Sequence, residues 1–242
     1  MTFSIAARDP QTGWLGVATS SKALSVGGLV PYVELGVGAI ASQSFVNPYL
    51  GLDGLRLLAD GMPAERAIER LIQGDPGRDV RQLGIVDKEG RAAAYTGAKC
   101  IAWAGHQLGG GYICLGNMLA NENVVPAMAT AFERSGGDAL YERLMLTLEA
   151  GEEAGGDRRG RQGAAIYIIG DEEYAVCDLR VDDHPDPVAE LRRILGVYVR
   201  EAVPFQAVSP KRDDFTPNWE MVMRVRDAME DSLSEKEAVK ES

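Results

Sequence analysis

Thr2, which follows the initiator methionine, is the first residue here whose type and position could do covalent chemistry. Removal of Met1 would leave Thr2 with a free α-amine beside its hydroxyl. An α-amine titrates near ~7.7–8.0, so part of it is neutral at pH 7 and can take the hydroxyl proton. A threonine activated by its own amine is a known kind of nucleophile. The alternative is that Thr2 simply lies on a strand, as most threonines after an initiator methionine would.

A second group of residues whose side chains could take part in binding or catalysis lies at residues 155–163, in the segment GGDRRGRQG. A guanidinium presents a fork of donors that matches a carboxylate. We therefore predict that Asp157, Arg158 and Arg161 hold a charged substrate. Asn47, in the polar turn Asn47–Pro48, is a further substrate-binding candidate. The alternative for residues 155–163 is an ordinary solvated loop.

The histidines and cysteines indicate no metal centre. His106 and His184 are far apart and lack metal-ligand spacing. We expect His184 to belong to the capping segment of a helix. Cys100, Cys114 and Cys177 are widely spaced in apolar, strand-like runs, which favours reduced, buried thiols in a cytoplasmic protein. No cofactor or metal is predicted.

Composition narrows the class of partner. The chain has 242 residues, a net charge of −11 and 45% hydrophobic residues. So acidic a chain argues against nucleic acid and anionic membranes as partners. No stretch approaches the ~20 apolar residues of a membrane span. We expect a cytoplasmic protein that binds a small molecule.

The elements that would position these residues follow from periodicity. Residues 2–22 alternate in strand fashion around the turn sequence DPQTG, which predicts a hairpin beginning at the first residues. Further hairpins are predicted at 82–95, 100–115 (strands 100–103 and 112–115) and 164–181, and a strand of small residues at 36–42. Helices are predicted within 51–74, split near Gly61 and Pro63, and at 124–134, 138–153, 187–198 and from 216 onward.

This order predicts an α+β fold. Tight turns give antiparallel sheets, and several strands lack polar alternation, so they are buried on both faces. Two stacked sheets with helix pairs outside, a four-layer αββα sandwich, satisfy this pattern. We expect the sandwich at residues 1–200, a connector and C-terminal helical extension at 201–230, and a disordered tail at 231–242.

Several segments resemble the N-terminal-nucleophile (Ntn) hydrolase superfamily and, more closely, an uncharacterised bacterial domain-of-unknown-function family assigned there. They are residues 2–5 (TFSI), 8–10 (RDP), 75–78 (DPGR), 100–106 (CIAWAGH), 116–119 (GNML), 155–162 (GGDRRGRQ) and 181–185 (VDDHP). The superfamily's fold is the αββα sandwich, and its members mostly cleave amide bonds.

By position, the resemblance implies catalytic roles. Thr2 would be the nucleophile and its amine the base, while Ser20 or Thr19 would orient the amine. Lys22 would lower the pKa of the amine by like-charge repulsion. Asn117 and its neighbouring backbone N–H groups would form the oxyanion hole. Residues 18–22 contain no acid, which departs from the proteasome-like members of the superfamily.

Three functions stay open at this stage. The leading one is an amidohydrolase that cleaves a small, carboxylate-bearing substrate with Thr2. The second is an Ntn-fold protein that binds a small anionic ligand without cleaving it. The third is an assembly subunit, with Trp219 and Met223 of the last helix at an interface. A homo-oligomer is expected.

Overall fold

The structure is a computed structural model that describes residues 2–206 and 208–240, the last ten of these by backbone only. Residues up to Arg192 form one compact unit, and residues from Arg193 form a second. The boundary falls within helix α5 (Pro187–Glu201), ahead of the one expected after residue 200. Every candidate site residue lies in the first unit.

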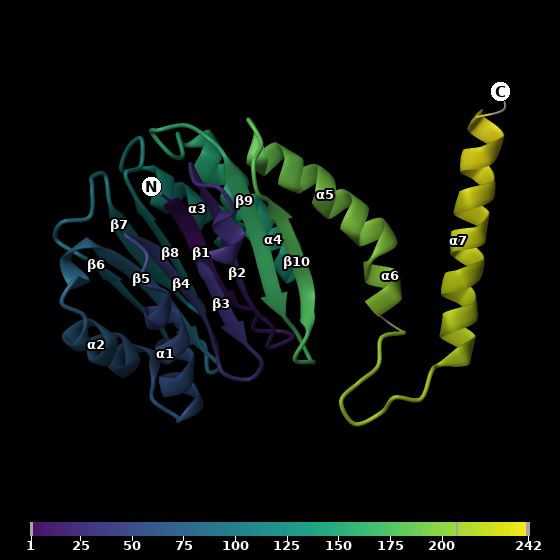
Figure 1. Cartoon of the computed structure of the whole chain (residues 1–242), viewed down its shortest axis with the longest axis horizontal. Coiled ribbons are helices and arrows are strands. Elements are labelled where there is room, and N and C mark those ends of the chain that lie inside the picture. Colours follow the sequence, from purple (N-terminus) through teal and green to yellow (C-terminus); the bar gives the residue numbers. More distant parts are fainter. Residues whose placement is uncertain (1, 207, 241–242) are drawn as a thin grey trace. The chain divides into compact units, whose positions relative to one another are not determined.

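Two antiparallel sheets make up the first unit (Figure 1). The six-stranded sheet has the order β10-β9-β2-β1-β8-β7, and the four-stranded sheet the order β3-β4-β5-β6. The strands are β1 (Thr2–Arg8), β2 (Leu15–Ser21), β3 (Pro31–Glu34), β4 (Gly38–Ser44), β5 (Arg81–Asp87), β6 (Ala92–Thr96), β7 (Gly105–Gly109), β8 (Tyr112–Asn117), β9 (Gly163–Ile169) and β10 (Ala175–Val181).

Helices cover the outer face of each sheet. The sheets contact each other mainly through β1 and β8 on one side and β4 and β5 on the other. Helices α1 (Pro48–Ala59) and α2 (Ala64–Gly74) pack on the four-stranded sheet, while α3 (Val124–Arg134) and α4 (Leu140–Glu153) pack on the six-stranded one (Figure 1). The predicted α+β class with two antiparallel sheets is thus confirmed.

The hairpin of β1 and β2 forms the two middle strands of the six-stranded sheet. In its turn, the Asp9 carboxylate accepts hydrogen bonds from the Thr12 N–H and hydroxyl, and Gly13 takes a φ of 79°, which favours glycine. Along β1 the side chains alternate between two buried faces. Phe3 faces α4, because a Cβ built on Gly151 would lie 3.0 Å from its ring. Thr2 and Ser4 therefore face the other sheet.

The predicted hairpin at 100–115 is wrong in its first strand. Residues 105–109 pair with β8, whereas the apolar run 100–103 forms a loop. The pairing of Gly109 with Tyr112 leaves a two-residue turn, in which Gly111 takes a φ of 77°. Glycines at the turn permit this tight connection, so the turn overrides the apolar pattern. Strand β3 was not predicted, and Cys100 lies outside any strand.

The second unit contains α6 (Val203–Gln206) and α7 (Trp219–Lys240). Trp219 and Met223 are exposed, at 67% and 39%. Helix α7 runs into the segment 231–242 for which disorder was predicted; the side chains of that segment and residues 241–242 lie outside the description, so its disorder stays a prediction. Within the described residues no helix is long and apolar enough to span a membrane.

Candidate functional site

Thr2 stands at the start of β1, between two neighbouring strands. It pairs with Ser21 of β2 and with Asn117 of β8, and only 7% of its surface is exposed. Directly paired residues of antiparallel strands share one face of the sheet. The Thr2 and Ser21 hydroxyl oxygens accordingly lie 3.2 Å apart. The predicted nucleophile therefore lies in an enclosed, polar position between the sheets.

The register does not bring Ser20 to Thr2. Ser20 pairs with Phe3 and so lies on the opposite face of the sheet, toward the helices. Ser21 takes the place beside Thr2 instead, and the Thr19 and Ser4 hydroxyl oxygens lie 2.8 Å apart on the same face. A shift of one residue in strand register moves every side chain of the strand to the other face of the sheet. The prediction for Ser20 was therefore wrong because the sequence does not reveal this register.

A network of buried amides lies next to Thr2. Gln82 Nε2 donates its two N–H groups to the carbonyl oxygens of Gly105 (3.0 Å) and Gly116 (2.7 Å), and Thr96 Oγ1 lies 3.0 Å from the same nitrogen. Its Oε1 accepts from Gln43 Nε2 at 2.8 Å and from Asn117 Nδ2 at 3.0 Å.

Gln43 joins this network to β1. Its Nε2 donates to the Thr2 carbonyl (3.3 Å), and its Oε1 accepts from the Ser4 hydroxyl (2.6 Å). The sequence analysis did not single out Gln43 or Gln82. The available signal was a glutamine inside each of two otherwise small or apolar strands, GAIASQS and RQLGIVD.

The backbone N–H groups predicted to form an oxyanion hole beside Asn117 have carbonyl partners in the structure. The Met118 N–H donates to the Ile101 carbonyl at 2.7 Å, and the Leu119 N–H donates to the Trp103 carbonyl at 2.9 Å. Both backbone donors beside Asn117 are thus committed to the loop before β7. The Asn117 side chain is fully buried, and among the described residues its Oδ1 has no hydrogen-bond partner. Asn117 consequently offers an acceptor where a donor was expected.

The loop at residues 155–163 bridges the strands on either side of β1. The Asp157 carboxylate accepts the Lys22 N–H at 2.8 Å, just beyond β2. Asp157 also pairs with Leu119, just beyond β8, and the Arg158 N–H donates to the Met118 carbonyl at 3.4 Å. Because β1 lies between β2 and β8, the loop spans the end of the sheet at which Thr2 begins.

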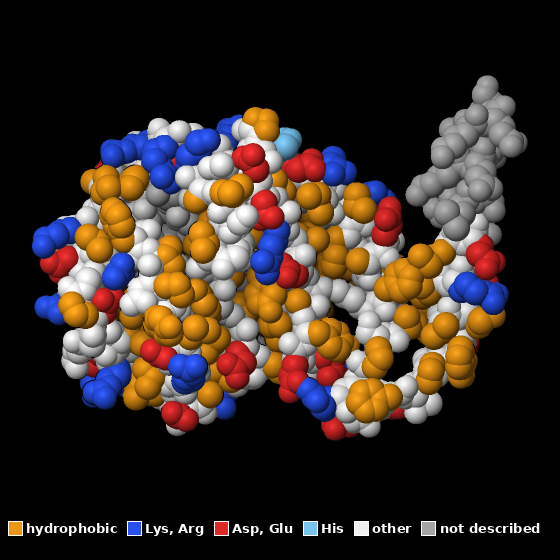
Figure 2. Space-filling view, viewed as in Figure 1, with side chains coloured by type: hydrophobic (Ala, Val, Ile, Leu, Met, Phe, Trp, Pro, Cys, Tyr) orange, Lys and Arg blue, Asp and Glu red, His pale blue; other side chains and the backbone are white. Residues whose placement is uncertain are grey.

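The charged candidates already have partners within the protein. Asp157 is buried and organises the loop, since it also accepts the Arg159 N–H at 2.8 Å. The Arg161 guanidinium pairs with Glu152 and Asp186. Arg158 is exposed. Figure 2 shows Lys and Arg side chains gathered along the upper edge of the first unit, the edge where Figure 1 places the N-terminus.

Lys22 also lies apart from its predicted role. Its ammonium donates to the Arg161 carbonyl at 3.3 Å, and the residue is exposed. Among the described contacts none joins this ammonium to Thr2. The repulsion between Lys22 and an N-terminal amine therefore stays a prediction.

His184, Cys114 and Cys177 are hydrogen-bonded or buried and do not add to this site. His184 Nδ1 accepts the Asp186 N–H at 3.0 Å, as expected for a capping segment ahead of α5. Burial raises the pKa of the Cys114 and Cys177 thiols, that of Cys177 to about 12, so neither is a thiolate at neutral pH. The part of the chain that the structure describes holds no cluster of three His, Cys, Asp or Glu that could bind a metal.

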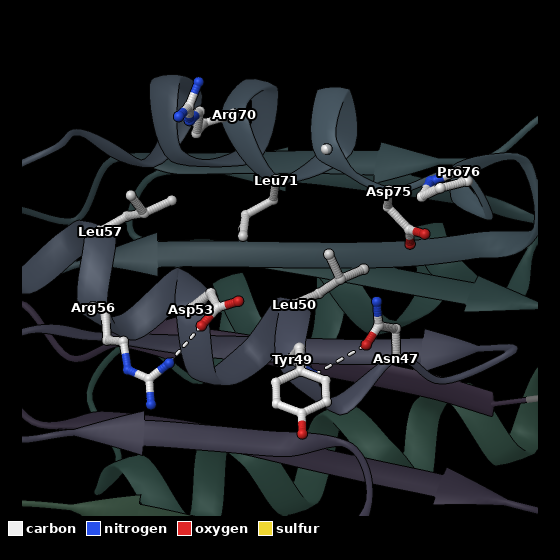
Figure 3. A pocket seen from close by; sticks show the side chains of 11 residues that line it. Asn47, Tyr49, Leu50, Asp53, Arg56, Leu57, Arg70, Leu71, Asp75 and Pro76 are labelled. Carbon is white, nitrogen blue, oxygen red and sulfur yellow. Dashed lines mark hydrogen bonds and ion pairs between the residues drawn. The ribbon is translucent and has the colours of Figure 1, made fainter.

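A pocket of about 460 Å³ lies between α1 and α2, on the outer side of the four-stranded sheet (Figure 3). Of the predicted site residues only Asn47 lines it, so the pocket does not contain Thr2. Asn47 Oδ1 accepts the Tyr49 N–H at 3.1 Å and caps α1, in which Pro48 is the first residue. The structure thus does not bring Asn47 together with the other candidates.

Asp75 is a buried carboxylate that lines this pocket (Figure 3). Arg81 Nε donates to its carboxylate at 2.9 Å, and the Gly77 N–H donates at 2.8 Å. Burial by itself raises the pKa of Asp75. The hydrogen bonds from Arg81, Gly77 and Asn47, with the charge of Arg81, outweigh burial and hold this pKa below its ordinary value.

We expect this depressed pKa to make stability depend on pH. The contribution of Asp75 is present above the pKa of the unfolded carboxyl, about 3.9, and is lost as pH falls through the lower folded pKa. Asp75→Asn should lower the free energy of unfolding by about 2 kcal/mol at pH 7. It should then lose less stability than the parent protein below about pH 4. Urea unfolding at several pH values measures both effects.

Asp53→Asn is the matched control, because Asp53 forms an exposed pair with Arg56. This variant should follow the parent curve. Parallel pH dependences for Asp75→Asn and the parent would contradict the assigned role of Asp75.

Comparisons with known proteins identify the family to which this chain belongs. A family model described as a family of unknown function, DUF1028, matches residues 2–191. The chain belongs to this family. The crystal structure of protein SPO2555 from Silicibacter pomeroyi, of the same family, is 34% identical with a TM-score of 0.81, and the match covers 89% of this chain and 94% of that one.

Two more distant structures also match. Anbu, an ancestral beta-subunit from Yersinia bercovieri, is 12% identical with a TM-score of 0.39, covering 87% of this chain and 99% of its own. Anbu from a Hyphomicrobium strain is 11% identical with a TM-score of 0.40, covering 83% and 96%. No curated protein matches the chain. Membership of DUF1028 is shown, while the wider Ntn superfamily stays a prediction.

Proposed function

We propose that this DUF1028 protein is an amidohydrolase whose nucleophile is Thr2 after removal of Met1, on the αββα sandwich of the Ntn hydrolases. The observation that carries the proposal is the position of Thr2. Its hydroxyl lies at the start of the central strand, nearly buried, 3.2 Å from the Ser21 hydroxyl and next to uncharged amides. A hydroxyl enclosed in this way can be activated by an amine on the same residue.

The reaction needs only Thr2 and water. The α-amine takes the proton of Oγ1 as Oγ1 bonds to the carbonyl carbon of the amide. When the C–N bond breaks, the ammonium returns that proton to the leaving nitrogen and an ester remains on Oγ1. Water then attacks the ester, gives a proton to the amine and releases the acid, and Oγ1 regains its proton. The sum is amide plus water to acid plus amine.

The substrate class that we propose is a small amide bearing a carboxylate. Support comes from the exposed basic residues of the loop that spans the start of β1, chiefly Arg158. The backbone N–H of Arg158 donates to the carbonyl of Met118, the residue after Asn117. Arginine matches carboxylates by its fork of donors. We also propose, from the sequence, that the protein is cytoplasmic and a homo-oligomer.

Mass spectrometry tests the proposal most directly. We expect the intact protein from its own host to lack Met1. A panel of small amides, half of them carrying a carboxylate, should include a substrate whose acyl group adds its mass to the peptide that begins with Thr2. Retention of Met1 would contradict the catalytic role. Binding of carboxylates without acylation would support the non-catalytic alternative.

A further inference from the structure

The side-chain oxygen of Asn117, Oδ1, is a hydrogen-bond acceptor that is fully buried and lacks a partner among the described residues. A buried polar atom without a partner costs free energy, and such atoms in native structures call for an explanation. The remainder of the buried polar set near Thr2, which includes Gln43 and Gln82, is hydrogen-bonded.

The orientation of this amide is determined by its neighbour. Gln82 must point its Nε2 toward the carbonyl oxygens of Gly105 and Gly116, which can only accept. Its Oε1 therefore faces Asn117 and requires a donor there, at 3.0 Å. Exchanging the nitrogen and oxygen of Asn117 would set two acceptors against each other. The oxygen is thus the atom left for another partner.

The register indicates which donor can reach it. Asn117 pairs directly with Thr2, and the side chains of such pairs lie on one face with Cβ atoms about 4.5–5.5 Å apart. While Met1 is attached, the Thr2 nitrogen is an amide with a single N–H. Removal of Met1 turns it into an amine, which has one further N–H donor at the same place when neutral and two when protonated.

We propose that Asn117 Oδ1 accepts a hydrogen bond from the free α-amine of Thr2, and that Gln82 is a positioning residue that holds Asn117 for it. This inference rests on the proposed removal of Met1 but not on catalysis. A bond from one N–H to Asn117 leaves the lone pair of the neutral amine available to the Thr2 hydroxyl. An acceptor also stabilises the ammonium form, so it raises the pKa of the amine.

Few charges compete with this effect. The side chains on this face, Ser4, Thr19, Ser21, Gln43 and Gln82, are all uncharged. Titratable groups on the adjoining segments include Lys22, whose ammonium donates to a loop carbonyl, and Asp157, whose carboxylate accepts from Lys22 and Arg159. His106 contacts the Thr96 hydroxyl beside Gln82. The pKa of the α-amine should therefore respond to Asn117.

The test measures that pKa without any substrate. Protein that begins with Thr2 is treated with trace acetic anhydride across a range of pH, and acetylation of the N-terminal peptide is followed by mass spectrometry. Asn117→Leu, which keeps the shape but removes the acceptor, should lower the pKa of the amine by about one unit. Gln82→Met should lower it by less, and Asn117→Asp should raise it. Thr147→Val, at a buried hydroxyl that donates to the Arg143 carbonyl within α4, should leave it unchanged.

Two results would overturn the inference. One is an unchanged amine pKa in Asn117→Leu with the parent's thermal unfolding curve. The other, decisive if Asn117→Leu does not fold, is an unchanged pKa in Asn117→Asp. A shifted pKa in a protein that hydrolyses no amide would leave the Asn117 contact standing and overturn only the proposed function. Hydrolysis that depends on Thr2, together with an unchanged amine pKa in the Asn117 variants, would leave the proposed function standing and overturn only the Asn117 contact.

Discussion

Thr2→Ala is expected to abolish amide hydrolysis while the fold remains. Loss of a nucleophile that acts together with its base lowers kcat by about 10⁴-fold or more. The fold should survive because the replacement removes only one methyl group and a hydroxyl whose described side-chain partner is the Ser21 hydroxyl. Turnover of the best amide and the thermal unfolding midpoint measure the two parts of the prediction.

Two variants sharpen this test. Thr2→Ser keeps a hydroxyl and should retain acylation of the first residue. Ser21→Ala removes the neighbouring hydroxyl and should keep most of the activity, because Ser21 has no amine of its own. If Thr2→Ala hydrolysed amides as fast as the parent and Ser21→Ala did not, Ser21 would be the reactive group and the mechanism proposed for Thr2 would be wrong.

Asp157→Ala is expected to have the largest effect on stability among the site residues. The carboxylate is buried and accepts the Lys22 and Arg159 N–H groups, each at 2.8 Å, and it also pairs with the Arg159 guanidinium at 3.2 Å. Its removal leaves these donors without their charged partner. We expect a loss of about 3 kcal/mol in the free energy of unfolding, or roughly 10 °C in the melting temperature.

Arg159→Ala is the matched control for Asp157. It removes the partly exposed ion pair with Asp157 and keeps both backbone hydrogen bonds to Asp157, so it should cost no more than about 1 kcal/mol. Because the Asp157 loop spans the start of β1, Asp157→Ala should also speed acetylation of the Thr2 amine. Equal losses in the two variants, measured by urea unfolding, would show that the backbone bonds to Asp157 contribute little.

Much of the fold could be predicted because it follows from local patterns. Alternation in residues 2–8, the turn sequence DPQTG and the helical stripes of residues 124–134 and 140–153 specify their elements without help from distant residues. The run 100–103 was misassigned because its apolar residues mimic a strand. Residues 105–109 pair with β8 instead, because the glycine turn at residues 110–111 brings that segment directly beside it.

The candidate site divides in the same way. The sequence determined that a threonine follows Met1 in a strand and that a basic, glycine-rich loop lies elsewhere, since both are contiguous features. Only the tertiary structure decided that Ser21 rather than Ser20 lies beside Thr2, that Asp157 accepts hydrogen bonds from Lys22, and that Gln82 Oε1 accepts from the Asn117 nitrogen and leaves the Asn117 oxygen for another donor. Strand register and contacts between sheets decide those points, and both depend on residues that are distant in sequence.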